Sequence, residues 1–240
     1  MHHFGRFDER ALAAHPVFAG HSRGYSSAPL INRQTGSVHT GLSIDQLAPA
    51  GTIDPHVHSF EEGVYILSGE PIVAIGSESY RLRPGDYAAI KVGTPHAWRA
   101  GDAAVRWLQM TAPQPKPPGA ERDTFFPNDR AIASSAPALD LDDRRGNLLG
   151  HFDASQIPPV GQRQNVAAGL EGEVQATLDG TSYQLKPGDV VWTGVGCVHS
   201  FKNVGTAPVR WLETFAPQPP KENVFRFMAE WETKARELEG

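Results

Sequence analysis

A repeat with a period of 103 residues constrains the fold of this chain more than any other feature. The run Tyr80–Asp86 returns as Tyr183–Asp189, with Leu, Pro, Gly and Asp in the same places. At the same offset Gly69-Glu70 matches Gly172-Glu173 and His96 matches His199; after one inserted residue, Arg106-Trp107-Leu108 matches Arg210-Trp211-Leu212. Self-similarity at a fixed period is typical of tandem structural units. We therefore predict two copies of one domain within the 240 residues.

Each copy is predicted to be all-β. Short alternating or apolar runs, such as 38–44, 64–68, 72–75, 79–82 and 87–90, are separated by glycine and proline turns, which is typical of a β-sandwich or barrel. We predict an N-terminal extension over 1–29, a first barrel over 30–112, a proline-rich linker over 113–128 and a second barrel over 129–217. Residues 8–24 are expected to form a short helix and a loop, and His2 and His3 to lie in a flexible terminus. A C-terminal helix is predicted over 218–240, because Phe225, Met228, Trp231 and Ala235 share one helical face.

The first copy carries a pattern typical of a metal site. His56 and His58 lie two residues apart, so on a strand both imidazoles point to the same side. Glu62 adds a carboxylate and His96 a third imidazole. Three nitrogens and one oxygen suit a divalent transition metal, and the sequence alone does not select among Fe, Mn, Zn, Ni, Co and Cu.

The second copy has lost this pattern. The offset of 103 places Pro159, Gly161 and Asn165 opposite His56, His58 and Glu62, and only His199 remains. Because one imidazole cannot hold a catalytic metal, we predict one metal per chain and a second barrel without one.

Composition argues against several classes of protein. The 22 Lys and Arg are outweighed by 27 Asp and Glu, giving a formal charge of −5, and no dense basic run is present, so nucleic acid is not an expected partner. No window approaches 18 apolar residues, which disfavours membrane insertion and secretion. The single cysteine, Cys197, fits a cytoplasmic location. Edge strands of such barrels favour a homodimer.

The motif residues resemble a known family. Gly51, His56, His58, Glu62 and Gly69, followed by Gly85-Asp86, Gly93, Pro95 and His96, are similar to the two motifs of the cupin superfamily, and the duplication resembles the bicupins. The departures are small: Gly51 lies one residue closer to the first histidine, Lys91 replaces a proline and Ala100 replaces an asparagine. The resemblance implies two small antiparallel jelly-roll barrels with the four ligands converging inside the first.

Other side chains could assist at this centre. Val64, Ile66 and Trp98 alternate with the ligands and are expected to form an apolar wall. The candidates for residues around the metal are His39, Tyr65, Tyr87, Trp98, Arg99 and Gln109. A structural role competes with a catalytic one for each, because such side chains on strands mostly pack or face water.

Three functions remain open, each with a small molecule as the ligand. Quercetinase-like cupin dioxygenases use a centre of three His and one Glu, which the four residues match by type. A redox-neutral aminohydrolase, lyase or isomerase is the second, since the two-barrel layout resembles ureidoglycine aminohydrolase, although that family carries its metal in the second barrel. The third is a non-catalytic protein that binds a metal and a ligand. The dioxygenase is favoured by what is common among cupins and not by any single residue of this sequence.

Overall fold

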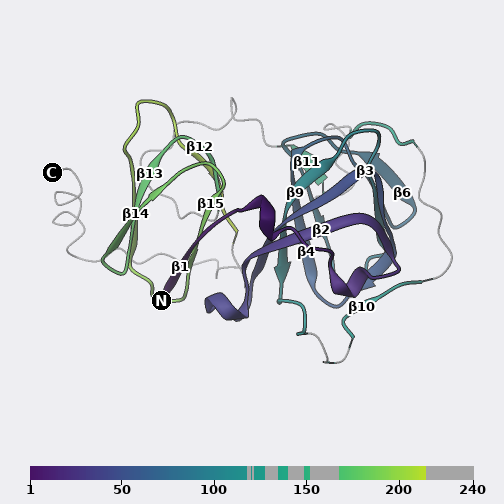
Figure 1. Ribbon diagram of the computed structural model, residues 1–240, viewed down its shortest axis with the longest axis horizontal. Helices are drawn as coiled ribbons and strands as arrows, with labels where there is room; N and C mark the ends of the chain where they lie inside the picture. Colours follow the sequence, from purple (N-terminus) through teal and green to yellow (C-terminus); the bar gives the residue numbers. More distant parts are fainter. Residues whose placement is uncertain (118–119, 121, 128–134, 140–148, 152–167, 215–240) are drawn as a thin grey trace. The chain divides into compact units, whose positions relative to one another are not determined.

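The computed structural model (Figure 1) describes residues 1–117, 120, 122–127, 135–139, 149–151 and 168–214. Within these residues the chain forms seventeen strands and three one-turn 3-10 helices, which confirms the all-β prediction. The predicted C-terminal helix over 218–240 lies outside the described residues. The part that is described contains no helix long and apolar enough to cross a membrane. Contacts divide the chain into a first unit, residues 5–160, and a second unit, residues 1–4 with 161–240.

The first unit is built on a ten-stranded antiparallel sheet, with the order β11-β7-β4-β9-β3-β8-β5-β6 and with β2 and β10 also paired to β3. Its strands are β2 Ser22–Ile31, β3 Gly41–His58, β4 Glu61–Ser68, β5 Ile72–Ile75, β6 Glu78–Arg81, β7 Asp86–Ile90, β8 His96–Arg99, β9 Val105–Ala112, β10 Thr124–Phe125 and β11 Leu149–His151. The short helices are η1 Glu9–Ala11, η2 Pro16–Phe18 and η3 Arg33–Thr35. The sheet curls around an apolar interior (Figure 1).

This interior follows from the alternation of side chains along the strands. Val64 and Ile66 of β4 are fully buried, and Trp98 of β8 stacks on Trp107 of β9 with ring centroids 5.4 Å apart. These residues belong to one continuous core cluster. The apolar wall predicted from the sequence is therefore buried on the side from which Glu62 and His96 also project.

The second unit contains two smaller sheets. One has the order β1-β15-β12-β17 and the other β14-β13-β16. The strands are β1 His2–Arg6, β12 Ala168–Glu171, β13 Val174–Leu178, β14 Thr181–Leu185, β15 Asp189–Thr193, β16 His199–Asn203 and β17 Arg210–Leu212. A separate core cluster that includes Val174, Ala176, Leu178, Leu185 and Val191 stabilises this unit.

Two turn motifs explain why the repeat has kept its sequence. Gly69 and Gly172 have φ angles of +76° and +78°, and a Cβ on either would approach a backbone carbonyl, that of Ala104 at 2.4 Å or of Pro208 at 2.8 Å. Only glycine fits both the left-handed backbone and the close approach. The Pro-Gly-Asp turns are also equivalent, because Asp86 and Asp189 are buried and accept hydrogen bonds from the backbone N–H three residues earlier, at 2.8 and 2.9 Å.

The N-terminal prediction was wrong. Instead of a flexible terminus, residues 2–6 form β1, which joins the sheet of the second unit beside β15. Instead of one helix, residues 8–24 contain the single turns η1 and η2 and the start of β2. The weak apolar periodicity of this segment is too short to sustain a helix, and strand pairing satisfies its backbone hydrogen bonds.

The unit boundary lies near residue 160, whereas the sequence placed the second barrel from residue 129. After the first copy the chain returns to the first unit. The strand β10 pairs with β3, residues 137–139 exchange backbone hydrogen bonds with Arg81 of β6, and β11 pairs with β7. Exposed strand edges accept further strands readily, and these segments pair with such edges.

Candidate metal centre

The four predicted ligands lie together inside the first unit. His56 and His58 come from the end of β3, Glu62 from β4 and His96 from β8. All four side chains are buried, and one donor atom from each lies within 4.8 Å of the others. The structure therefore brings together the full set that the sequence predicted.

Strand register explains this convergence. His56 is the cross-strand partner of His96, and their ring centroids are 4.0 Å apart. The His58 ring lies 4.8 Å from the His96 ring, because it is two residues further along the same side of β3. The two-residue turn between β3 and β4 then returns Glu62 to within reach of both.

All three imidazoles are held in the same way. The Nδ1 atom of His56 lies 2.9 Å from the carbonyl oxygen of Asp54, that of His58 lies 2.5 Å from the carbonyl of Phe60, and that of His96 lies 3.0 Å from the carbonyl of Thr94. A carbonyl only accepts, so each Nδ1 carries a proton, and each Nε2 is the ring nitrogen available to a metal. Hydrogen bonds of this kind usually orient metal-binding histidines.

The electrostatics of the centre fit a bound cation. Glu62 Oε2 lies 3.1 Å from His58 Nε2 and 3.8 Å from His96 Nε2. Burial opposes ionisation of Glu62, but the two neighbouring imidazoles outweigh it and hold the pKa of that carboxyl below its usual range. Burial, followed by the nearby His96, lowers the pKa of His56 to about 3, so His56 is neutral at physiological pH. A neutral imidazole and an ionised carboxylate are the forms that bind metals.

One buried atom of the centre supports this fit independently. Among the residues that the structure describes, His96 Nε2 has no hydrogen-bond partner. A buried polar nitrogen without a partner costs about 1–3 kcal/mol. A metal ion bound by His56, His58, Glu62 and His96 would satisfy this nitrogen, so the donor set fits a divalent transition metal.

Aromatic rings surround the ligands, and the sequence did not reveal them. Phe60 stacks on His58 with centroids 4.1 Å apart, and Phe18 meets His56 edge-on at 5.1 Å. Phe126 lies 5.9 Å from His56 and stacks face to face on His21 at 3.8 Å. We call Phe18, Phe60 and Phe126 the aromatic collar. Two of its members come from segments predicted as an extension and a linker, where no periodicity indicated that they would return to the site.

A buried acidic network was also missed. The carboxylate of Asp45 on β3 is fully buried and accepts hydrogen bonds from Tyr25 Oη at 2.5 Å and Ser27 Oγ at 2.6 Å. Burial raises the pKa of Asp45 to about 6, and the charge of Glu62 adds to this effect. Tyr25 contacts the collar, with its ring 5.2 Å from that of Phe18. An acid two residues before the apolar Leu47, and so on the same side of the strand, is the only signal the sequence offered.

The other six candidate residues differ in burial and in the side of the sheet from which they project. His39 is exposed and lies before β3, away from the ligands in the sheet. Tyr65 is buried but alternates with Glu62, so it projects from the other side of β4, opposite Tyr87 in register. Trp98 belongs to the core, Arg99 is half-buried at the end of β8, and Gln109 accepts a hydrogen bond from Trp107 Nε1 at 3.1 Å. Of the six, only Trp98 and Gln109 extend from the ligand side of the sheet.

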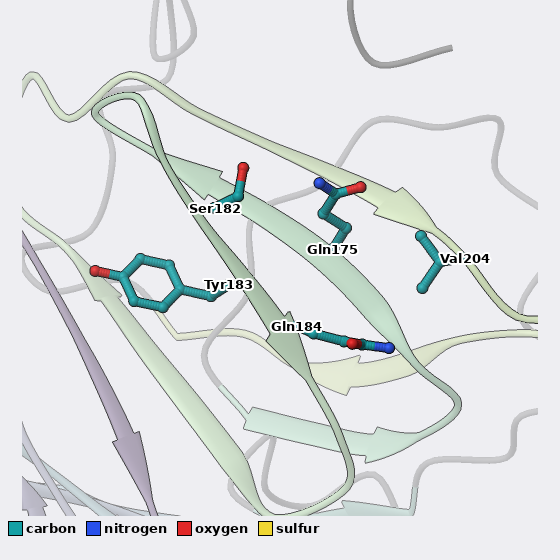
Figure 2. Close-up of a pocket in the computed structure, with 5 residues that line it drawn as sticks. All are labelled: Gln175, Ser182, Tyr183, Gln184 and Val204. Atoms are coloured by element: carbon teal, nitrogen blue, oxygen red, sulfur yellow. The ribbon is translucent and has the colours of Figure 1, made fainter. Parts of the chain in front are cut away.

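In the second unit one histidine corresponds to a ligand of the first. His199 Nδ1 lies 2.8 Å from the carbonyl of Cys197, the same two-residue contact that orients His96. In the described part of the chain His199 is not in a group of three metal-ligating side chains, and Pro159, Gly161 and Asn165 lie outside the described residues. A pocket on this unit is lined by Gln175, Ser182, Tyr183, Gln184 and Val204 (Figure 2). These side chains do not include a metal-ligating acid or imidazole.

Comparisons with known proteins agree with this arrangement. The family model described as "Cupin domain" matches residues 43–111 and 162–215. A stretch of 57 residues is 39% identical to quercetin 2,3-dioxygenase of Bacillus subtilis (strain 168), covering 23% of this chain and 17% of that protein. The matched region is thus a small fraction of that relative.

Solved structures resemble the chain over most of its length. A putative glyoxylate induced protein from Pseudomonas aeruginosa superposes with a TM-score of 0.59 at 18% identity, covering 87% of this chain and 85% of the other. The oxalate decarboxylase of Lactobacillus farciminis, in a formate complex, gives a TM-score of 0.56 at 14% identity over 86% and 83% of the two chains. At these identities the likeness shows a shared fold.

Proposed function

The chain belongs to the cupin family, and on that premise we propose that its first unit is the active site of a metal-dependent enzyme for a small organic metabolite. We propose dioxygenation of a metal-chelating substrate as its reaction. The observation that carries the proposal is the convergence of His56, His58, Glu62 and His96, with each imidazole already oriented through Nδ1. The local similarity to a quercetin 2,3-dioxygenase supports the choice of reaction.

The ligands would hold the metal and leave one or two coordination positions for other molecules. When bound, such a metal supplies Lewis acidity and, if it is redox-active, reactivity with dioxygen. The residues of this chain orient and shield it. The three Nδ1 contacts fix the ligand rings, and Glu62, ionised in its buried position, contributes the negative charge.

The aromatic collar would define the approach of the substrate. Phe60 and Phe18 contact the ligand rings directly, and Phe126 covers His56 from the β10 side. Apolar rings exclude water, which strengthens electrostatic interactions within the site. They also offer flat surfaces to a planar substrate.

Oxygen uptake tests the proposal. Metal-depleted protein would be loaded anaerobically with Fe(II), Mn(II), Ni(II) or Zn(II) in parallel and mixed with flavonols, enediols and dicarboxylates. We expect oxygen consumption that requires both a redox-active metal and one substrate class, with both atoms of ¹⁸O₂ found in the products. His58→Ala should abolish it. His199→Ala is the matched control, because His199 has the same backbone contact as His96 but, within the described residues, belongs to no group of three metal-ligating side chains.

A redox-neutral reaction is the second candidate. It is favoured by the match to an oxalate decarboxylase over most of both chains. Metal-dependent turnover that continues at the same rate without oxygen would support it and contradict the dioxygenase proposal. Tight metal binding without turnover of any substrate would contradict both and favour a binding protein.

A further inference from the structure

A second group of metal-ligating side chains lies in the second unit. His2 of β1, Asp179 in the turn between β13 and β14, and Cys197 in the turn before β16 each place a donor atom within 4.8 Å of the other two. All three belong to the same unit, although 195 residues separate the first from the last. We call them the His-Asp-Cys cluster. It shares no residue with the cupin motifs.

Asp179 is the centre of the cluster. Its Oδ2 atom lies 2.8 Å from the α-amino group of Met1 and 3.2 Å from His2 Nδ1, and its Oδ1 accepts a hydrogen bond from the Val198 N–H at 3.0 Å. The hydrogen bond from the Met1 amino group, followed by that from His2, holds the pKa of Asp179 well below its usual range. The carboxylate is therefore ionised, and a metal ion would displace the Met1 ammonium that now pairs with Oδ2.

His2 is held in an orientation that suits a ligand. Its Nε2 lies 2.9 Å from Tyr183 Oη, and its Nδ1 faces Asp179. In Figure 2 the Tyr183 ring projects away from the Gln175 and Gln184 side chains, as alternation along β14 requires. Because a carboxylate only accepts, the proton of His2 lies on Nδ1 when Asp179 is its partner. A metal at Nδ1 would take the place of that proton, and Nε2–H would then donate to Tyr183 Oη, which is the usual arrangement of metal-binding histidines.

Cys197 supplies the soft donor. The residue is only 8% exposed and packs in the core cluster of the second unit. Burial, followed by the negative charge of Asp179, raises the pKa of the Cys197 thiol to about 11. The free thiol is therefore protonated and a poor nucleophile. A metal would bind the thiolate, and the proton would pass to solvent.

We propose that the His-Asp-Cys cluster binds Zn²⁺ and fastens β1 to the second unit. Sulfur, imidazole nitrogen and carboxylate oxygen together are typical zinc ligands. Bond lengths of about 2.0–2.3 Å require donor atoms to lie roughly 3.3–3.8 Å apart, so side-chain shifts of about 1 Å would close the site. The side chains of His2 and Asp179 are 16% and 34% exposed, which leaves room for water as the fourth ligand. The proposal does not depend on the function of the first unit.

Cobalt provides a direct test, because a cobalt–thiolate bond gives an intense near-ultraviolet charge-transfer band that the sulfur-free first centre cannot produce. The full-length His58→Ala protein, with its first centre disabled, would be titrated with Co²⁺ alone. We expect one cobalt per chain and the thiolate band. Cys197→Ser should remove the band and weaken binding by more than about 100-fold, since even indirect partners of metal ligands change affinity by about 10- to 100-fold.

Neighbouring residues give matched controls. His3 follows His2 on β1 and its side chain points to the other side of the strand. In the same background, His3→Ala should leave the cobalt affinity unchanged, whereas His2→Ala should reduce it at least 10-fold. Zinc should raise the Tm of the His58→Ala protein, and this increase should be lost in Cys197→Ser. Absence of the thiolate band from His58→Ala, or a band that survives His2→Ala at undiminished affinity, would overturn the proposal.

Discussion

Asp45 should make the stability of the first unit depend on pH in an unusual direction. Its carboxyl is fully buried, and its pKa is raised from 3.8 to about 6, chiefly by burial. The folded state therefore binds a proton more tightly than the unfolded state. A group of this kind stabilises the protein fully below pH 3.8, and its contribution is lost as the pH rises through 6.

The magnitude follows from the two pKa values. At about 1.4 kcal/mol per pKa unit, the difference between 3.8 and about 6 is worth about 3 kcal/mol of unfolding free energy. His56 contributes in the opposite direction over part of this range. Burial lowers its pKa from 6.5 to about 3, so its contribution to the unfolding free energy rises with pH between these two values. The pH profile of the native protein alone is thus a sum of opposing contributions.

Comparison with Asp45→Asn isolates the contribution of Asp45. The amide keeps the shape and can still bond to Tyr25 Oη and Ser27 Oγ, but it does not titrate. Urea unfolding of the two metal-free proteins would be measured from pH 4 to pH 7.5. We expect the stability of the native protein relative to the variant to fall by about 2.4 kcal/mol across this window, because part of the full difference is already lost at pH 4. A constant difference would refute a raised pKa for Asp45, and a rising one would show that the carboxylate is stabilised by its hydrogen bonds.

The other predictions concern the metal ligands, the collar and the conserved turns of the repeat. His58→Ala should lower the metal content by one equivalent and His199→Ala should not, as mass spectrometry of the native complex would show; equal losses would contradict a centre confined to the first unit. Phe126→Ala should weaken binding of the aromatic chelator tropolone to the metal-loaded protein by about 2- to 10-fold, the value of one aromatic contact. Phe125→Ala, which removes a 51% exposed ring next to it, should have no effect in the same calorimetric titration. Gly69→Ala and Gly172→Ala should each destabilise the protein by more than Gly76→Ala, for which the left-handed backbone costs about 1–2 kcal/mol and no atom lies within 4 Å of the new Cβ. Equal urea midpoints for the three variants would contradict the steric argument.

The metal ligands could be predicted because their positions depend on local rules. His56 and His58 share a side by strand alternation, and the turn to Glu62 is short. His96 required the repeat and the family resemblance, since its pairing with His56 joins strands 40 residues apart in sequence. Strand register over such a distance depends on the whole barrel rather than on neighbouring residues.

The surroundings of the centre could not be predicted for the same reason. Phe126 lies in a proline-rich stretch, and such composition indicates stiffness but not the direction of the chain. The pairing of β10 with β3, which brings this ring to His56, depends on a strand edge elsewhere in the fold. Tyr25 lies in the predicted N-terminal extension and Asp45 directly after the predicted run 38–44, so nothing in the sequence indicated the hydrogen bond between them.

The place of β1 has a consequence for the order in which the protein folds during synthesis. Residues 1–4 are made long before the strand beside which they lie, because β15 begins at Asp189. Residues 5–160 can fold while those first residues remain without their strand partner. Closing so long a loop is entropically costly, so this pairing is expected to be the last step and the slowest to recover after unfolding. A strand that is made early is then the last to find its position.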